Sequence, residues 1–531
     1  GNSWDQQPTV PPHNDIGGEA EWDNVGGAIA LSKTGTTLAI GAIWNDGEDS
    51  TDTKRGHVRV YAYDGDYWRQ RSGDLDGENP GDQFGESVAL SADGNVLAAG
   101  STYNRGEDAE VDAASRGHTR VFAWNGTTYE QVGEDIDGER YDASGMSVAL
   151  SSDGHVLVVG AWQYGTGQPD DKAGLVRVYG VQYHSPAPVG NPYSPAPSRP
   201  FYQTATRYVW TGQELNGDPG DHAGKALALS ADGLVLAVGA HSADPPDGTG
   251  GTINNAGRVV VREWSAQAAE WVDRAVVNGE DSHDAIGEPI ALSADGAVLA
   301  IGEYNHDTNN AGRVRVFDWD AMGDAYVRRD DPNGKLWGDA GGDNAGFSVA
   351  LSADGAIVAV GTTGYDTVRG RVRVFVWDAT GGTWTQRGQD GQLDGVAEND
   401  AQGYSVALSD DGTVLAVGAD KYSQSGTAYG GLARVWTWYG GAWQQRGQNI
   451  LGDGAYTQAG IEVDLSADGT VLAVGDRGID IFNGGPLNDR GRVTVYEYNA
   501  DNDHWDDRGE PILGEANGCL LYTSDAADEL R

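Results

Sequence analysis

The chain contains little sulfur: its 531 residues include one cysteine and two methionines. A single cysteine excludes an internal disulfide framework. The sequence also lacks any run of about 18 consecutive apolar residues, the length that a membrane-spanning helix needs. We therefore expect a fold without disulfides and no membrane insertion by this part of the chain.

Positive charge is scarce as well. Lysine and arginine together number 35, against 80 aspartates and glutamates, which gives a formal net charge of −45. Nucleic acid is excluded as a partner because a phosphate backbone requires a basic surface, and an anionic membrane surface is disfavoured for the same reason. Such acidity suits a highly soluble protein, a high-salt environment or a protein that gathers divalent cations. Solubility alone is the simplest explanation.

Glycine, in contrast, is abundant, with 80 residues, which indicates many turns. The phrase Ala-Leu-Ser-Ala-Asp-Gly or a near copy of it occurs eight times. The leucine of this phrase stands at Leu31, Leu90, Leu150, Leu229, Leu292, Leu351, Leu408 and Leu465. Successive copies are 57 to 63 residues apart, with one interval of 79, so the chain is a repeat array.

Each repeat predicts four short strands, as the second copy illustrates. The apolar runs 87–91 and 96–100 flank an Asp-Gly turn, which is a strong hairpin signal. Residues 118–124 alternate like a strand with one buried face, and an Asn-Gly turn leads from them into a fourth strand at 129–132.

Four-stranded antiparallel units at this spacing predict an all-β fold, a β-propeller whose blades pack radially. Eight blades are favoured and seven are the alternative. Residues 1–27 are expected to supply an outer strand and loop that close the ring, and residues 28–515 to form the blades. The proline-rich residues 182–206 predict an extended surface insertion. Residues 516–531 depart from the repeat and look non-native.

The repeat resembles the FG-GAP repeats of integrin-alpha-like propellers in two of three elements. Phe-Gly occurs at Phe84-Gly85, and Gly-Ala occurs at Gly160-Ala161, Gly239-Ala240 and Gly418-Ala419. The third element, proline, is absent, and Trp162, His241 and Asp420 take its place. The resemblance implies ligand binding or adhesion, extracellular or at the cell surface, with calcium held in an Asp-x-Asp-x-Asp-Gly loop of some blades.

That calcium loop is not carried over to this chain. The corresponding turn is only Ser-Ala-Asp-Gly, as at residues 230–233 and 352–355. One aspartate cannot enclose a calcium ion, which needs several oxygen ligands. We expect this aspartate to shape the turn instead.

The longest and most acidic loops should share one face of the ring, because strand direction alternates within each blade. Long loops on a rigid scaffold usually carry function. The candidate ligand-binding residues are Asp46, Glu48, Asp49, Asp52, Glu107, Asp108, Glu110, Asp112, Asp170, Asp171, Asp244 and Asp247. Loops that connect successive blades add Asp82, Asp142, Asp221, Asp284, Asp343 and Asp400 to the expected electronegative face.

Two explanations of these carboxylates remain open: they solvate the loops, or they bind a protein, a glycan or divalent cations. Their separation along the chain argues against one tight metal cage built from sequence-local ligands. No cofactor is certain, and calcium held weakly between adjacent loops is the one candidate. Asn125, in an Asn-Gly-Thr sequence, is a candidate glycosylation site. A hairpin turn accounts for the Asn-Gly pair equally well.

Catalytic motifs are missing from the sequence. The ten histidines are scattered without ligand spacing, and neither a Gly-x-Ser-x-Gly elbow nor a phosphate-binding loop occurs. We therefore predict a monomeric, non-enzymatic binding propeller with a protein or glycan ligand, extracellular or at the cell surface. The alternative is a secreted propeller enzyme acting on carbohydrate, which requires two carboxylates that converge in a partly buried pocket at the axis.

Overall fold

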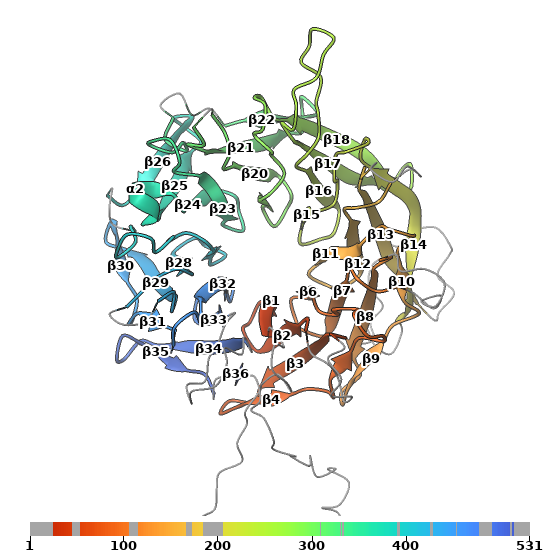
Figure 1. Cartoon of the computed structure of the whole chain (residues 1–531), viewed down its shortest axis with the longest axis horizontal. Helices are drawn as coiled ribbons and strands as arrows, with labels where there is room; N and C mark the ends of the chain where they lie inside the picture. The colour runs from red at the N-terminus through yellow and green to blue at the C-terminus, as the bar shows by residue number, and fades with distance from the viewer. Residues whose placement is uncertain are drawn as a thin grey trace, which may run out of the picture.

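Eight antiparallel β-sheets are arranged in a ring around a central axis in the computed structural model (Figure 1). The structure describes residues 25–44, 54–105, 115–165, 172–183, 205–509 and 512–513, apart from residues 308, 330, 332–333, 390–392, 425–427, 453 and 477–490. Each sheet is one blade made of consecutive strands, and we number the blades 1 to 8 in chain order. The predicted eight-bladed propeller is confirmed, and the seven-bladed alternative is wrong.

Each blade has four strands in chain order from the axis outwards, and four blades add a short strand that pairs with the third strand. Blades 1 to 4 comprise β1 (Val25–Leu31), β2 (Thr37–Ala42), β3 (His57–Tyr63), β4 (Trp68–Gln70) and β5 (Leu75–Asp76); β6 (Ser87–Leu90), β7 (Val96–Ser101), β8 (His118–Trp124), β9 (Tyr129–Gln131) and β10 (Ile136–Asp137); β11 (Ser144–Leu150), β12 (Val156–Ala161), β13 (Leu175–Tyr183) and β14 (Ala205–Asn216); and β15 (Ala226–Leu229), β16 (Val235–Ala240), β17 (Arg258–Ser265) and β18 (Glu270–Asn278).

Blades 5 to 8 repeat the same order. They comprise β19 (Ile290–Leu292), β20 (Val298–Glu303), β21 (Arg313–Asp320) and β22 (Ala325–Arg328); β23 (Ala345–Leu351), β24 (Ile357–Thr362), β25 (Arg371–Asp378) and β26 (Thr383–Arg387); β27 (Val406–Leu408), β28 (Val414–Ala419), β29 (Leu432–Tyr439), β30 (Ala442–Gln445) and β31 (Ile450–Leu451); and β32 (Ala459–Leu465), β33 (Val471–Asp476), β34 (Arg492–Asn499), β35 (His504–Asp507) and β36 (Ile512–Leu513). One helical turn, α2 (Tyr365–Val368), lies between β24 and β25. No helix in the described part of the chain is long and apolar enough to span a membrane.

The hydrophobic core lies between neighbouring blades. The second strand of each blade is buried along its whole length, as in β7 and β16. One cluster joins Val58 and Val60 of blade 1 to Leu97 of blade 2. Tryptophans of the fourth strands, such as Trp68 and Trp505, are fully buried in these layers. These tryptophans therefore have a structural role in the packing of the blades.

The Gly-Ala element marks a close approach between the backbones of two blades. Gly239 in β16 faces the carbonyl oxygen of Gly287 in blade 5, and a Cβ atom at Gly239 would collide with it. Gly100 in β7 meets Gly145 of blade 3 in the same way. The repeated glycine is therefore required by the packing of the ring, since any side chain would separate the blades.

The ring closes through contacts between blades 8 and 1. The guanidinium of Arg508 donates a hydrogen bond to the carbonyl oxygen of Gly35 over 2.7 Å and lies 4.1 Å from the centre of the Tyr63 ring. The outer position of blade 8 is already held by β35 from the end of the chain. Residues 1–24 lie outside the described residues, so the predicted N-terminal closing strand stays a prediction.

Two further expectations concern turns and loops. In the turn between β15 and β16, the hydroxyl of Ser230 donates to Asp232 over 2.6 Å and accepts from the backbone N–H of Val235 over 2.9 Å. The aspartate therefore shapes the turn, as predicted. The proline-rich insertion is shorter than predicted, because β13 and β14 pair as far as Tyr183 and Ala205. Residues 184–204 and 516–531 lie outside the described residues.

Candidate functional site

Two of the twelve candidate loop carboxylates fall within the described residues. Asp46, Glu48, Asp49, Asp52, Glu107, Asp108, Glu110, Asp112, Asp170 and Asp171 lie outside the described residues. Asp244 and Asp247 are described and exposed. Asp244 accepts the backbone N–H of Asn255 over 2.6 Å, and Asp247 accepts those of Thr249 and Gly251 over 2.7 and 2.9 Å. These two carboxylates organise their own loop.

The aspartates between successive blades do not belong to an exposed face, which corrects the expectation from sequence. Asp82, Asp142, Asp221, Asp284, Asp343 and Asp400 are all buried, at 1 to 4% exposure. Asp142, for example, accepts the backbone N–H of Glu139 over 2.6 Å, and burial raises its pKa to about 6. The carboxylate accepts hydrogen bonds from backbone N–H groups of its own turn. The length of the loop did not predict this role.

Asn125 lies in the predicted turn between β8 and β9. Its side-chain oxygen accepts the backbone N–H groups of Thr127 and Thr128 over 2.8 and 2.9 Å. Its amide nitrogen donates to Glu130 over 2.6 Å. These contacts account for asparagine at the turn, and glycosylation stays a prediction.

A cavity of about 570 Å³ lies at the axis and is lined by residues of blades 1, 2, 5, 6, 7 and 8. The first strands of the blades face this region (Figure 1). Its walls combine two glutamates, Glu86 and Glu462, with the aromatic rings of Phe347 and Tyr404. Known ligand pockets have volumes in the range of about 300 to 1,000 Å³. The volume of this cavity falls within that range, and the cavity is therefore a candidate binding site.

Blade 8 departs from the repeat at this cavity. The first strand of blade 2 has Ser-Val-Ala-Leu at residues 87–90, whereas β32 has Glu-Val-Asp-Leu at residues 462–465. Because alternate residues of a strand point to the same side, both carboxyl groups face blade 1. Sequence reasoning missed this pair, although an alignment of the eight repeats against one another shows it.

Glu462 also changes how two blades are joined. In blade 7 the hydroxyl of Ser405, at the equivalent position, donates to the carbonyl oxygen of Gly460 over 2.9 Å. Glu462 instead accepts a hydrogen bond from the backbone of Ile29 in β1. Asp464 accepts the N–H of Leu31 over 3.1 Å. The inner edge of β1 is thus held by two acidic side chains.

The two carboxyl groups have perturbed acidities. Burial, and then the negative charge of Asp464, raise the pKa of Glu462 to about 8. Burial raises the pKa of Asp464 to about 6. Glu462 is therefore protonated at neutral pH unless a cation enters the cavity, since a nearby positive charge would favour its ionised form.

The remaining cavity wall adds a third carboxyl group and a cluster of rings. Glu86 is only partly exposed and accepts the hydroxyl of Thr102, and burial raises the pKa of Glu86. The Phe347 ring centre lies 5.2 Å from that of Tyr404 and 5.7 Å from that of Tyr304. Acidic groups beside aromatic rings are suited to an organic cation, which is attracted to both.

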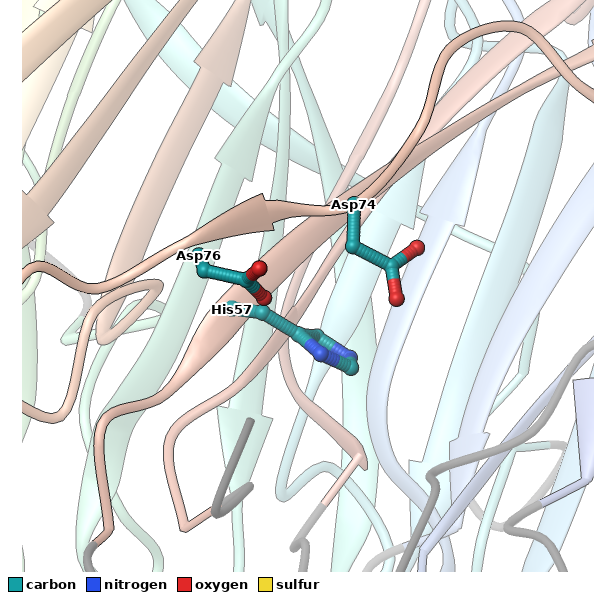
Figure 2. Close-up of side chains that lie close together, drawn as sticks. All are labelled: His57, Asp74 and Asp76. Atoms are coloured by element: carbon teal, nitrogen blue, oxygen red, sulfur yellow. The ribbon is translucent and has the colours of Figure 1, made fainter. Parts of the chain in front are cut away.

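Three groups of one histidine and two carboxylates could hold a metal ion elsewhere in the described part of the ring. Figure 2 shows the first, where His57 lies between Asp74 and Asp76. The second consists of Glu78, His118 and Asp135, and the third of Asp281, Asp284 and His306. Within each group, the nearest ligand atoms all lie within 4.8 Å of one another.

Comparison with known proteins supports the propeller fold and does not extend to function. The sequence matches no model of a known protein family and no curated protein. Among solved structures, the chain is similar to Sqt1 from Chaetomium thermophilum bound to the N-terminus of ribosomal protein L10, with 16% identity and a TM-score of 0.52 over 91% of this chain and 100% of that one. The same protein solved alone gives 15% identity and 0.53 over 92% and 99%. A candidate 6-phosphogluconolactonase from Bacteroides uniformis gives 11% identity and 0.41 over 90% and 98%.

Proposed function

We propose that this propeller binds a protein ligand by receiving a cationic group of that ligand, a lysine side chain or an N-terminal amine, in the axial cavity. The observation that carries the proposal is the joint presence of Glu86, Glu462 and two aromatic rings in one cavity of about 570 Å³. An ammonium group would pair with the carboxylates and lie against the rings of Phe347 and Tyr404. A bare metal ion would leave most of this volume unfilled.

The net charge of −45 favours the same class of ligand, because a strongly negative protein attracts basic segments and accelerates their encounter. The Sqt1 propeller bound to the N-terminus of another protein is an example of a ring with this fold that holds a polypeptide terminus. The proposal for this chain does not depend on that likeness. The FG-GAP relationship, an extracellular or cell-surface location and a monomeric state stay predictions.

The proposal is tested by isothermal titration calorimetry with tetra-lysine amide at neutral pH and physiological salt. Binding should release protons, because the cation converts Glu462 from its neutral to its charged form. Titrations in two buffers of different ionisation enthalpy measure that release. Glu462→Gln should abolish proton release and weaken binding, whereas Glu270→Gln, an exposed residue on the outer strand β18, should change neither. Equal affinity and proton release in all three proteins would exclude the cavity as the site.

A carbohydrate-cleaving enzyme is the second candidate function, favoured by one specific observation. Glu462, with its raised pKa of about 8, faces the same partly buried cavity as Glu86, as a general acid and its partner carboxylate would. Hydrolysis of a panel of aryl glycosides that is lost in Glu462→Gln would favour this candidate. Absence of turnover across the panel, together with tetra-lysine binding, favours the binding function.

A further inference from the structure

The first residue of the third strand has a repeated electrostatic role in this ring. In blades 4, 5 and 6 this position is arginine, and its guanidinium pairs with an acidic residue of the loop that enters the blade. Each acidic residue directly follows a glycine in the segment that connects the two blades. The pairs are Arg258 with Asp218 over 3.1 Å, Arg313 with Glu280 over 2.7 Å and Arg371 with Asp339 over 2.7 Å.

Blade 2 keeps the acidic residue but lacks the arginine. The equivalent acid is Glu78, and the equivalent of the arginine is His118. An imidazole lacks the permanent positive charge of a guanidinium, and its nitrogens can bind a metal ion instead. The carboxylate of Glu78 therefore lies beside a potential metal ligand where the other blades supply a fixed positive charge.

A second carboxylate, that of Asp135, adds another negative charge at the place where the arginine is missing. Asp135, which precedes β10, places Oδ2 3.7 Å from Nδ1 of His118, while its Oδ1 accepts the side-chain amide of Gln131 over 2.7 Å. Partial burial, and then the negative charge of Asp135, raise the pKa of Glu78. Two like charges thus lie close together, an arrangement that a bound cation would stabilise.

His118 is buried, at 0% exposure, and neither of its ring nitrogens has a hydrogen-bond partner among the described residues. A buried imidazole without a partner loses the free energy of the hydrogen bonds it makes in water, so such groups usually have a reason to remain. Glu78, in contrast, is exposed, which gives solvent access to the cluster.

Two positive charges, those of Arg120 and Arg55, lie close to the cluster. The guanidinium of Arg120 donates to the backbone carbonyl of Asp76 and lies 4.3 Å from the ring centre of Phe84. Arg55 donates to the backbone carbonyl of Glu78 over 3.2 Å. Four carboxylates, those of Asp135, Glu78, Asp82 and Asp76, surround the guanidinium of Arg120. Four carboxylates against two guanidiniums leave the local charge negative.

In the other two histidine clusters, carboxylates already have hydrogen-bonding or charged partners. In blade 1, Arg59 donates to both oxygens of Asp74 over 2.9 and 2.8 Å, so this carboxylate already pairs with a cation. In the third cluster, Nδ1 of His306 lies 2.9 Å from Asp284, which also accepts backbone N–H groups. In the blade 2 cluster, both ring nitrogens of His118 lack a hydrogen-bond partner among the described residues, and Asp135 accepts from the neutral amide of Gln131 rather than from a cation.

We propose that Glu78, His118 and Asp135 bind one divalent transition-metal ion of the Zn²⁺ class between blades 1 and 2. The ion would take the place that the guanidinium occupies in blades 4 to 6. One imidazole with two carboxylates suits Zn²⁺, whereas Ca²⁺ prefers oxygen ligands alone. Three protein ligands leave a coordination position for water on the side of the exposed Glu78.

The experiment is equilibrium binding of Zn²⁺ to the whole chain, with Co²⁺ as a spectroscopic substitute and Ca²⁺ as competitor. We expect one equivalent of Zn²⁺ bound at least about tenfold more tightly than the remaining ions that the acidic surface collects, with a Co²⁺ absorption band typical of nitrogen and oxygen ligation. An equal concentration of Ca²⁺ should not displace it.

The repeat itself supplies variants that should fold. His118→Arg installs the residue that blades 4, 5 and 6 carry at this position, and it should abolish the tight equivalent by filling its place with a guanidinium. Glu78→Gln, at an exposed residue, should weaken it by about tenfold or more. His57→Leu, the matched change in blade 1, should retain full affinity, because blades 3 and 7 carry leucine there.

Two results would overturn the proposal. One is the absence of any Zn²⁺ equivalent tighter than the surface background. The other is a tight equivalent whose affinity and Co²⁺ spectrum are the same in His118→Arg and Glu78→Gln as in the unaltered chain, because that ion would be bound elsewhere.

Discussion

The acidic pair of blade 8 should make the stability of the ring depend on pH in a way that one substitution removes. Glu462 ionises near pH 4.5 in an unfolded chain and near pH 8 in the fold. Between these values the folded state holds a proton that the unfolded state has released. Stability therefore falls as the pH rises from about 4.5 to 8 and levels off above that.

The size of the effect follows from the shift. A change from 4.5 to about 8 corresponds to at most about 5 kcal/mol, since one pKa unit is worth about 1.4 kcal/mol. Glu462 is partly exposed to solvent and its pKa is coupled to that of Asp464, so we expect about 2 kcal/mol. Glu462→Gln can still accept the N–H of Ile29 and carries no charge. It should leave stability unchanged at pH 5 and raise it by about 2 kcal/mol at pH 9.

The assay is urea unfolding followed by tryptophan fluorescence at several pH values, with midpoints compared at constant slope. Glu270→Gln, on the exposed outer strand β18, serves as the control and should follow the unaltered chain. Some dependence below pH 6 should survive in Glu462→Gln, because Asp464 titrates there with a raised pKa of about 6. If Glu462→Gln showed the same loss of stability between pH 6 and 9 as the unaltered chain, the buried ionisation would not be its source.

Three further substitutions test the packing of the ring. Arg508→Ala removes the hydrogen bond to Gly35 and the contact with Tyr63, and should lower the free energy of unfolding by about 2 to 4 kcal/mol in urea melts. Gly239→Ala should reduce soluble yield and lower the melting temperature strongly, because its Cβ meets a backbone oxygen of the next blade. Ser230→Ala should cost about 1 kcal/mol by the same urea assay, since the N–H of Val235 loses its acceptor.

Much of the fold was predictable from sequence because the same strand and turn patterns occur eight times along the chain. The Asp-Gly turns and the strands that flank them recur in the structure. The one-sided burial predicted for residues 118–124 is wrong, because β8 is buried on six successive residues, with neighbouring blades covering both of its faces. The outermost strands of the blades were harder to predict. The short strand β36 pairs with β34 beyond the end of β35, and no period in the sequence marks where such an outer strand breaks and resumes. Burial of aspartates such as Asp142 was also missed, because a carboxylate that accepts its own turn's N–H groups looks the same in sequence as a solvated one.

The site was harder to predict for a related reason. Loop length and acidity drew attention to one face, whereas the axial carboxyl groups lie within a strand, where the surrounding residues Val463 and Leu465 look like ordinary core. The informative signal was a residue that differs between repeats, not the large number of acidic residues. Glu462 stands where blade 2 has Ser87, and among 80 acidic residues that contrast is visible only when the blades are compared with one another.

A ring of equivalent blades gives such differences an energetic meaning. Each inter-blade interface repeats the same backbone geometry, so the other blades show which side chain satisfies a given position at little cost. Glu462 and Asp464 place two carboxyl groups where a serine hydroxyl and an alanine methyl suffice elsewhere. His118 places an imidazole where an arginine neutralises an acid in blades 4 to 6. Glu462 and Asp464 accept backbone N–H groups of β1, but these contacts leave two acidic groups close together where the other blades carry none. His118 makes no hydrogen bond in place of the ion pair that the arginines form. A cation from outside the chain would stabilise both sites.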